Sequence, residues 1–432
     1  MARTNWAGNI TYNADRVVSP ASVAEAQEIV RRAAKVRVLG SRHCFNPIAD
    51  TEGVHLSFEN LKGISVDRAK GQVTVAGGVT YGDLGPALYA EGYTLHNTAS
   101  LPHISVAGAT ATATHGSGTA LGSLATAVAA LEFIDGSGNL VTLSRAGNPD
   151  TFPGAVVHLG ALGAVTAITL DVKPAFAVRQ DIYLDLPHAR LEADFDRIMG
   201  SGYSVSLFTD WQHPAIEQLW VKSRVDPAVR WVAPDTFGAR PAGRPMHPIM
   251  HLDAVHCTEQ MGVAGPAYDR LPHFKVGSTP ASGSELQVEY FVPLRHAVAA
   301  IRAVRAFGPR FAGLLMVSEV RTIAADDLWL SPFCSEACVA FHFSFEKDWP
   351  KLRQLLPDLE AGLMPFGVRP HWGKLFTMPA ASVQSLYPKL PAFRALIEKH
   401  DPAGKFRNTF VDRYIFGQSG AGTSASGVPQ PR

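Results

Sequence analysis

The sequence predicts an α+β protein with two domains and a short tail. Its 432 residues are enough for about two or three domains of ordinary size. Helical and strand patterns alternate up to about residue 178, with Gly-rich joints between them. Further on, tryptophan, phenylalanine and charged residues become more common. We therefore expect one domain over 1–178, a second over 179–417 and a disordered tail over 418–432.

Start and stop signals mark the elements of the first domain. Ser22-Val-Ala-Glu25 has the capping-box pattern that begins a helix. Thr80 is a typical N-cap, and the helix that it starts ends at Gly92. Asp135-Gly-Ser-Gly-Asn139 is a turn sequence between two apolar runs and predicts a β-hairpin. The strands expected here are Val36–Leu39, Val54–Phe58, the hairpin Ile64–Asp67 with Gln72–Ala76, the hairpin Leu131–Ile134 with Leu140–Leu143, and Val165–Val172.

The second domain is predicted to be an antiparallel sheet backed by helices. Glu285–Val292 alternates polar and apolar residues, as a strand covered on one face does. Met316–Ile323 and Val339–Phe345 have similar patterns. Apolar spacing favours helices over Leu191–Met199 and Pro293–Ala306.

Charge and composition exclude several classes of protein. Lys and Arg number 39 and Asp and Glu 38, so the net charge of +1 creates no field that would attract nucleic acid. Gly92–Leu131 and Thr151–Leu170 lack charged residues, but their Pro, His and small residues do not suit a membrane span. We interpret both as buried backbone around a non-protein group. Met1–Trp6 has no signal-peptide core. A cytoplasmic monomer without membrane or nucleic-acid partners is expected.

The cysteines do not indicate a metal site. Four cysteines in 432 residues make no disulfide framework. Cys334, Cys338 and His342 have a spacing that would form a metal-binding face on a helix. Their surroundings alternate like a strand, which separates the three side chains. We predict thiols that pack in the interior and no bound metal.

Common nucleotide and hydrolase motifs are absent. Gly367-Val-Arg-Pro-His-Trp-Gly373-Lys374 has five residues between its glycines where a phosphate loop has four, and Leu375 replaces the Ser or Thr. No Gly-x-Gly-x-x-Gly follows a strand, which argues against a nicotinamide dinucleotide fold. No Gly-x-Ser-x-Gly elbow supports a serine hydrolase.

Two Gly-rich segments remain, Val38–Asn46 and Ser100–Gly118. Small residues let the backbone approach a ligand closely, and free N–H groups can hold a pyrophosphate. The second segment adds several Ser and Thr hydroxyls and no cationic side chain. We favour an anionic cofactor buried in these loops. The alternative is a set of tight turns in a packed core.

Longer motifs occur along almost the whole chain. They are Asn5-Trp-Ala-Gly-Asn-Ile-Thr-Tyr12, Gly40-Ser-Arg-His43-Cys-Phe-Asn46, Ser100-Leu-Pro-His-Ile-Ser-Val-Ala-Gly108, Thr114-His-Gly-Ser-Gly118, Ser206–Trp211, Cys257–Gln260, Glu319-Val-Arg321, Pro370-His-Trp-Gly-Lys374 and Asp401–Phe406. In this order they resemble the alditol oxidase (xylitol oxidase-like) group of the vanillyl-alcohol-oxidase, PCMH-type flavoprotein superfamily. Cys44 departs from the expected serine, but a thiol is nearly isosteric with it.

The resemblance implies a two-lobed PCMH-type FAD-binding domain and a substrate domain. It implies FAD attached covalently through His43, with His371 near the polar edge of the flavin ring. The cofactor-binding residues that it implies are Val38, Leu39, Gly40, Ser41, Arg42, His43, Cys44, Ser100, Ser105, Gly108, Ala111, Thr112, Ala113, Thr114, His115, Val165 and His371.

On the substrate side, Glu319 and Arg321 are two residues apart, so a strand presents both on one face. An exposed ion pair is the ordinary interpretation of such a pair. The resemblance implies instead a buried pair that reaches the substrate, with Arg321 and Lys374 as catalytic groups around the reacting hydroxyl. The implied substrate-binding residues are Ser100, Glu319, Arg321, Ser344 and Lys374; at Ser344 the family often has threonine.

The activity implied is oxidation of the terminal primary alcohol of alditols to the aldose, with O2 reduced to H2O2. Xylitol and sorbitol are the expected substrates, and glycerol a weaker one. One alternative is a sugar-1,4-lactone oxidase or dehydrogenase of the same superfamily. A second is a non-catalytic flavin-binding or carbohydrate-binding protein, against which Glu319, Arg321 and Lys374 argue together.

Overall fold

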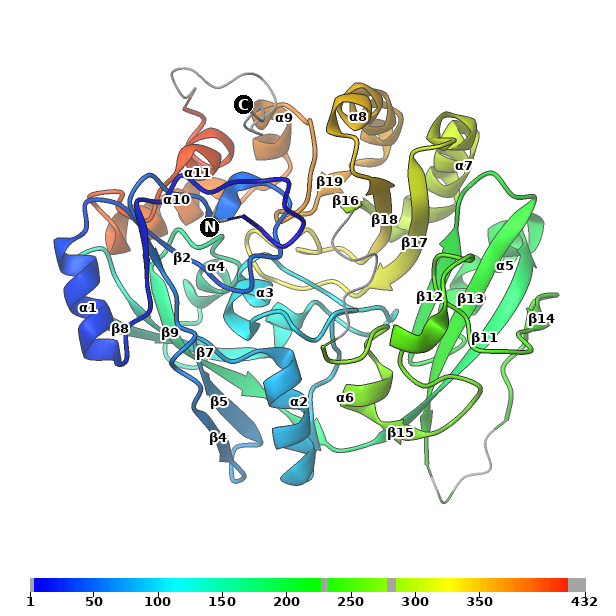
Figure 1. Ribbon diagram of the computed structural model, residues 1–432, viewed down its shortest axis with the longest axis horizontal. Helices are drawn as coiled ribbons and strands as arrows, with labels where there is room; N and C mark the ends of the chain where they lie inside the picture. The colour runs from blue at the N-terminus through cyan, green and yellow to red at the C-terminus, as the bar shows by residue number, and fades with distance from the viewer. Residues whose placement is uncertain (1–3, 227, 229–231, 278–284, 419–432) are drawn as a thin grey trace.

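The structure is a computed structural model that describes residues 4–226, 228, 232–277 and 285–418. Two regions of β-sheet with covering helices make up these residues, which confirms the α+β prediction (Figure 1). The division of the chain at residue 178 stays a prediction. Of the predicted tail, only Gln418 lies among the described residues.

Within the described residues, the N-terminal part of the chain forms three sheets. The first is parallel with the order β1-β3-β2, and the second is antiparallel with the order β4-β5-β9-β7-β8. The third is a short antiparallel pair of β6 and β10. Both predicted hairpins, β4 with β5 and β7 with β8, are confirmed. The elements are β1 Arg16–Val18, α1 Val23–Arg32, β2 Val36–Val38, β3 Val54–Leu56, β4 Ile64–Asp67, β5 Gln72–Ala76, α2 Tyr81–Ala90, β6 Tyr93–Thr94, α3 Val106–Ala111, β7 Val128–Ile134, β8 Leu140–Ser144, α4 Phe152–Val156, β9 Ala164–Asp171 and β10 Lys173–Pro174.

The predicted helix starts lie where the capping signals placed them. Thr80 forms a complete capping box with Asp83 at the start of α2. Ser22 caps α1 by accepting a hydrogen bond from the Glu25 N–H, but the Glu25 carboxylate accepts from the Ala21 N–H and not from Ser22. The Ser22 signal therefore fixes the helix start without forming a reciprocal box.

The rest of the chain contributes a nine-stranded sheet of order β14-β11-β13-β12-β17-β18-β16-β19, with β15 paired to β11. All pairings within it are antiparallel, as predicted. Its elements are β11 Ala177–Pro187, α5 His188–Met199, β12 Ser204–Thr209, β13 Ala215–Val225, β14 Arg240–Pro241, β15 Gly265–Pro266, α6 Ala267–Arg270, β16 Glu285–Pro293, α7 Ala297–Phe307, β17 Leu315–Ile323, β18 Cys338–Glu346, α8 Trp349–Leu363, β19 Arg369–Pro370, α9 Ala380–Ser385, α10 Leu390–His400 and α11 Thr409–Tyr414.

The polar face of β16 is not a solvent face. All nine positions of the strand are buried, although polar and apolar residues alternate along it. The helix expected to start at Pro293 begins at Ala297, because β16 extends to Pro293 and a 3-10 turn follows. The polar residues of β16 therefore face an interior space.

Cross-strand register places polar side chains in rows across the centre of this sheet. His342 on β18 pairs with Glu319 on β17 and with Glu289 on β16. In the next row, Ser344 pairs with Val317 and Gln287. Residues opposite each other on neighbouring strands share a face. The sheet therefore gathers these groups without help from loops.

The C-terminal segment returns to the N-terminal lobe, and α10 and α11 lie beside it (Figure 1). The Val36 N–H donates to the Lys405 carbonyl at 2.9 Å. The buried guanidinium of Arg37 donates to the carbonyls of Ile48, Leu159, Gly160 and Phe406. Burial lowers the pKa of Arg37 to about 10, so it remains a cation at neutral pH. These bonds hold the loop after β2 against the rest of the fold.

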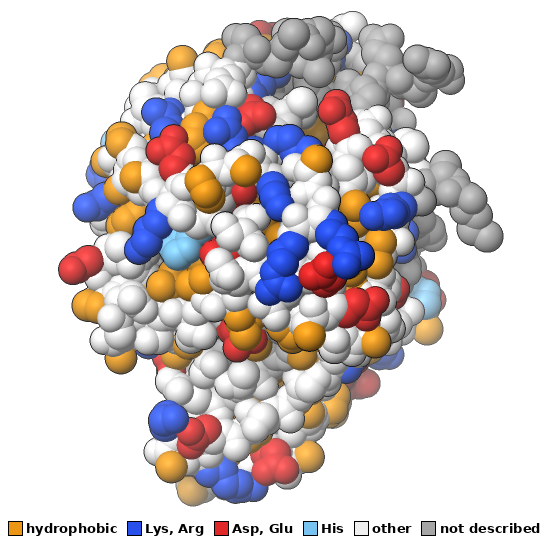
Figure 2. Space-filling view, turned by 90° about the vertical axis from the view of Figure 1, so that its left-hand side faces the viewer, with side chains coloured by type: hydrophobic (Ala, Val, Ile, Leu, Met, Phe, Trp, Pro, Cys, Tyr) orange, Lys and Arg blue, Asp and Glu red, His pale blue; other side chains and the backbone are white. Residues whose placement is uncertain are grey.

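The surface carries charged side chains of both signs. Side chains of both charges are interspersed over the face shown in Figure 2. In the part of the chain that the structure describes, no helix combines the length and the apolar character needed to cross a bilayer.

Candidate active site

A cavity of about 820 Å³ lies between the Gly-rich loops and the centre of the nine-stranded sheet. This volume is in the range of cofactor and ligand sites. Both uncharged stretches contribute to its wall, as expected for backbone around a non-protein group. The predicted site residues that line it are Val38, Leu39, Gly40, Ser41, Arg42, His43, Cys44, Ser100, Ser105, Gly108, Ala111, Thr112, Thr114, His115, Val165, Glu319, Arg321, Ser344, His371 and Lys374. Ala113 does not reach the cavity.

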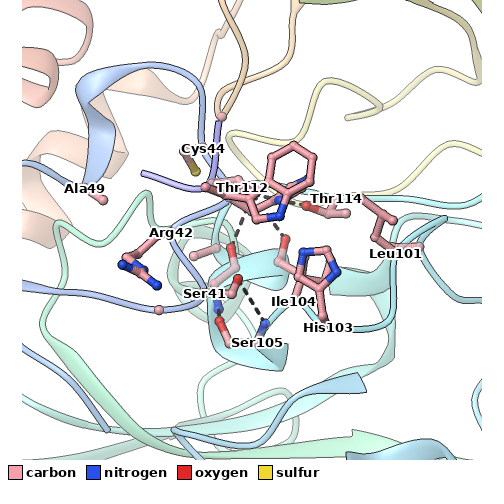
Figure 3. Close-up of a pocket in the computed structure, with 18 of the residues that line it drawn as sticks. Ser41, Arg42, Cys44, Ala49, Leu101, His103, Ile104, Ser105, Thr112 and Thr114 are labelled. Carbon is pink, nitrogen blue, oxygen red and sulfur yellow. Dashed lines mark hydrogen bonds between the residues drawn. The ribbon is translucent and has the colours of Figure 1, made fainter. Parts of the chain in front are cut away.

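One end of the cavity is a cradle of small residues, which we call the cofactor cradle: Gly40, Ser41, Ser105, Gly108, Thr112 and Thr114. A Cβ atom at Gly40 or at Gly108 would lie 2.7 Å from the Ser105 Oγ, so a side chain at either position would displace that hydroxyl. The Ser105 N–H donates to the Ser41 Oγ at 3.3 Å, and the two residues lie next to each other in Figure 3. The cradle thus offers hydroxyls and closely approachable backbone, a donor set that fits a pyrophosphate.

Three residues in the loops around the cradle have a strained backbone. Arg42, Ala113 and Leu159 have φ angles of 60°, 55° and 55°, in the left-handed region that L-residues avoid. Such strain persists only where the surroundings enforce it. Ala113 is fully buried and stands between Thr112 and Thr114, which both face the cavity. Ala113 therefore shapes the loop that carries the two threonines and does not itself line the cavity.

His43 lies beside the cradle in an aromatic surrounding. Its ring centroid is 4.7 Å from that of Trp6, 5.1 Å from that of His103 and 5.9 Å from that of Phe45. Its Nδ1 is buried and has no hydrogen-bond partner among the described residues. Burial lowers the pKa of His43 well below its ordinary value, and the neighbouring His103 and Lys374 add to the shift. The imidazole is therefore neutral and keeps a nitrogen lone pair.

At the other end of the cavity, Glu289 accepts from three segments of the chain. Arg321 Nη2 is 2.6 Å from its Oε1, and His115 Nε2 is 3.2 Å from the same oxygen. Lys374 Nζ is 3.1 Å from Oε2. Burial alone would raise the pKa of Glu289, but Lys374 and Arg321 hold it well below its ordinary value. The carboxylate is ionised and is surrounded by cations.

Glu319 is the second buried carboxylate. Its Oε1 accepts from His273 Nε2 at 2.8 Å, and its Oε2 lies 3.5 Å from Arg321 Nε. Burial favours the neutral acid, but Arg321 and His273 lower the pKa of Glu319 below its ordinary value. The predicted buried Glu319–Arg321 pair is present, although the shorter contact of Arg321 is to Glu289.

The two predicted hydroxyls line the same cavity as these charges. Ser100 Oγ is 3.4 Å from Arg321 Nη1. Ser344, on β18, is 5% exposed and lines the cavity. His371 is buried at the cavity wall, and its Nδ1 accepts from the Gly373 N–H at 2.9 Å. Burial lowers the pKa of His371 to about 3, so its ring is neutral.

Sequence reasoning did not identify Glu289, His273 or His342. Glu289 belongs to the alternation of β16, but alternation alone does not distinguish a face turned to solvent from one turned to a cavity. His342 was noted only in connection with the cysteines. It lies between Glu319 and Glu289 in the sheet, lines the cavity and has a buried Nε2 without a partner in the described part of the chain.

Known protein families match both parts of the cavity, the cofactor cradle and the charged groups on the nine-stranded sheet. Residues 14–144, which include the cofactor cradle, match the model of an FAD binding domain. Residues 274–414 match the model named D-arabinono-1,4-lactone oxidase. A cholesterol oxidase from Brevibacterium sterolicum has the same fold, with a TM-score of 0.79 and 16% identity over 96% of both chains. A solvent-stable cholesterol oxidase gives a TM-score of 0.77 over 95% of this chain and 96% of its own. The predicted PCMH-type architecture is confirmed.

The fold and the site together define an FAD-dependent oxidoreductase. Among curated relatives, an alditol oxidase from Streptomyces sp. (strain IKD472 / FERM P-14339) is 46% identical over 95% of this chain and 98% of its own. An L-gulono-1,4-lactone dehydrogenase from Mycobacterium tuberculosis is 28% identical over the same shares. The chain belongs to the alditol oxidase family.

Replacing Glu289 tests whether this carboxylate stabilises the cations around it. Glu289→Gln keeps the shape of the side chain but leaves Arg321 and Lys374 without their shared counter-charge in a buried site. We expect a loss of about 3 kcal/mol in the free energy of unfolding, as is typical when one partner of a buried ion pair is removed. Chemical denaturation measures it.

Glu285→Gln is the matched control. Glu285 lies four residues earlier on the same face of β16 and is also buried, but its hydrogen-bond partner is the neutral Gln287. Burial raises the pKa of Glu285, so the amide replaces a group that already tends toward neutrality. Equal destabilisation by the two variants would contradict the role given to Glu289.

Proposed function

We propose that this protein oxidises the terminal primary alcohol of alditols such as xylitol and sorbitol to the aldose. Two hydrogens leave the alcohol, and O2 takes them up to form H2O2. One observation carries the proposal: two cations, Arg321 and Lys374, lie with hydroxyl-binding groups in the same cavity as the cofactor cradle. The 46% identity to an alditol oxidase over nearly the whole chain supports the substrate class.

FAD, when bound, supplies the two-electron oxidant and passes the electrons to oxygen. The residues that would hold it are the cofactor cradle and its neighbours, with His371 at the polar side of the ring. His43 would be the covalent anchor, because its neutral, unpartnered nitrogen is available for bond formation. The uncharged hydroxyls and tight glycines of the cradle support binding of the pyrophosphate.

Arg321 and Lys374 would act on the reacting hydroxyl. Negative charge develops on the alcohol oxygen as its proton leaves, and preorganised cations stabilise such charge most when water is excluded. Glu289 holds both cations in place before substrate arrives. Ser100, Ser344 and Glu319 would bind the remaining hydroxyls and orient the chain, which lowers the entropic cost of reaching the reactive geometry.

A sugar-1,4-lactone substrate is the second candidate. It is favoured by the match of residues 274–414 to the D-arabinono-1,4-lactone oxidase model, a range that includes Glu319, Arg321 and Lys374. The lower identity of 28% to a lactone dehydrogenase over the same length makes it the weaker candidate. Cytoplasmic location and a monomeric state stay predictions.

The covalent anchor can be tested by denaturing the protein in acid. If His43 is linked to FAD, the yellow colour sediments with the polypeptide, and a tryptic peptide containing His43 carries the flavin mass. His43→Ala should release the flavin into the supernatant, whereas His213→Ala, at an exposed histidine, should not. Free flavin from the unmodified protein would contradict the anchor.

Lys374→Met tests the catalytic cation. The flavin spectrum should persist, while anaerobic flavin reduction by xylitol slows by about a hundredfold, the typical loss for one transition-state charge partner. Stopped-flow absorbance measures the rate. Lys351→Met, at an exposed lysine on α8, should leave it unchanged. An unaltered rate in Lys374→Met would remove this residue from the mechanism.

A substrate panel with peroxide detection tests the function itself. A site built to bond hydroxyls discriminates against ligands that lack them, because its own buried groups are then unpaired. We expect kcat/KM to rise from short diols through glycerol to xylitol and sorbitol, with one peroxide formed per aldose. Faster turnover of L-gulono-1,4-lactone would transfer the assignment to the lactone candidate.

A further inference from the structure

A fully buried lysine lies behind the substrate face of the cavity. Lys222, on β13, is 1% exposed, and charged side chains are rarely buried to this extent. Its Nζ donates to the Leu271 carbonyl at 2.5 Å, to the Pro272 carbonyl at 3.0 Å and to His273 Nδ1 at 3.1 Å. These three contacts use all the hydrogens of an ammonium group.

The contacts on the two sides of the His273 ring fix its tautomer. The ionised Glu319 carboxylate can only accept, so the ring hydrogen is on Nε2 and Nδ1 accepts from Lys222, whose pKa burial lowers to about 7. Nε2 then donates to Glu319 Oε1 at 2.8 Å. Burial and the nearby Lys222 lower the pKa of His273 to about 4, which agrees with a neutral ring.

Packing fixes the orientation of the same ring. The rings of Trp220 and Phe208 meet it edge to face, with centroids at 5.3 Å and 5.5 Å. The backbone N–H of His273 donates to the Ser100 carbonyl at 3.1 Å. This bond ties the loop of His273 to a predicted substrate-binding residue. His273 and Glu319 both line the cavity, whereas Lys222 does not.

We propose that Lys222 and His273 are positioning residues that hold the ionised Glu319 carboxylate in a fixed orientation to accept a substrate hydroxyl, and that this relay sets the preference for polyols over simple alcohols. The proposal rests on the proposed function. Glu319 has one oxygen committed to His273 and the other beside Arg321, so the relay determines which lone pairs remain for the substrate. A carboxylate that could rotate would offer no fixed acceptor.

Steady-state kinetics of the FAD-loaded enzyme test the relay, with xylitol and 1-propanol, which has no second hydroxyl for Glu319, as paired substrates. Lys222→Met keeps the length of the side chain and removes its three donors. We expect KM for xylitol to rise about tenfold with kcat nearly unchanged, because binding to a charged acceptor is lost. For 1-propanol, kcat/KM should stay constant. Lys275→Met, at an exposed lysine two residues beyond His273, should alter neither substrate.

His273 provides a second route that does not depend on the folding of Lys222→Met. In His273→Gln the amide nitrogen can take the place of Nε2 and donate to Glu319, whereas His273→Leu cannot. The ratio of kcat/KM for xylitol to that for 1-propanol should fall about tenfold in His273→Leu and stay close to the unmodified value in His273→Gln.

A double variant tests whether Lys222 acts through the Glu319 carboxylate. In a Glu319→Gln background, Lys222→Met should add no further loss for xylitol, because it acts through that carboxylate. An additive loss, or an equal loss for both substrates in Lys222→Met, would reduce Lys222 to a packing role and overturn the relay alone. No peroxide from the unmodified enzyme with any polyol would overturn the proposed function and the relay with it.

Discussion

The ionised carboxylate of Glu289 is the constraint on which the polar half of the cavity depends. Arg321 comes from β17, Lys374 from the segment after β19 and His115 from the loop after α3, and all three reach this one side chain. Arg321 and Lys374 both contact this one carboxylate, and in a buried site two neighbouring cations repel each other strongly unless an anion lies between them. Glu289 therefore joins the Gly-rich segment that contains His115 to the centre of the nine-stranded sheet, and the position of β16 in the sheet fixes it.

Local signals predicted much of the fold and the cofactor side of the site. Turn and cap chemistry located both N-terminal hairpins and the starts of α1 and α2, because these features depend on a few adjacent residues. The Gly-rich loops were identifiable for the same reason, since a Cβ atom at Gly40 or Gly108 would collide with the Ser105 hydroxyl. Strand alternation placed Glu319 and Arg321 on one face, and the resemblance then assigned them to the substrate.

Such local signals do not predict contacts between residues that are far apart in the sequence. Glu289 meets Lys374 and His115 across 85 and 174 residues, and the polar alternation of β16 would look the same on a solvent-facing strand. Lys222, His273 and Glu319 come from β13, a loop and β17, so nothing in any one segment indicates their contact. The α+β class was predictable from patterns, whereas the arrangement of charges depends on how the sheet brings its strands together.

Bound FAD and this charge arrangement would together oxidise an open-chain polyol. Anaerobic titration of the unmodified protein with xylitol, followed by the visible flavin absorbance, is the decisive measurement. We expect xylitol to bleach the absorbance and admission of oxygen to restore it with the formation of H2O2. A flavin that xylitol leaves oxidised, but that a sugar-1,4-lactone bleaches, would show that the cavity is not built for an open-chain polyol.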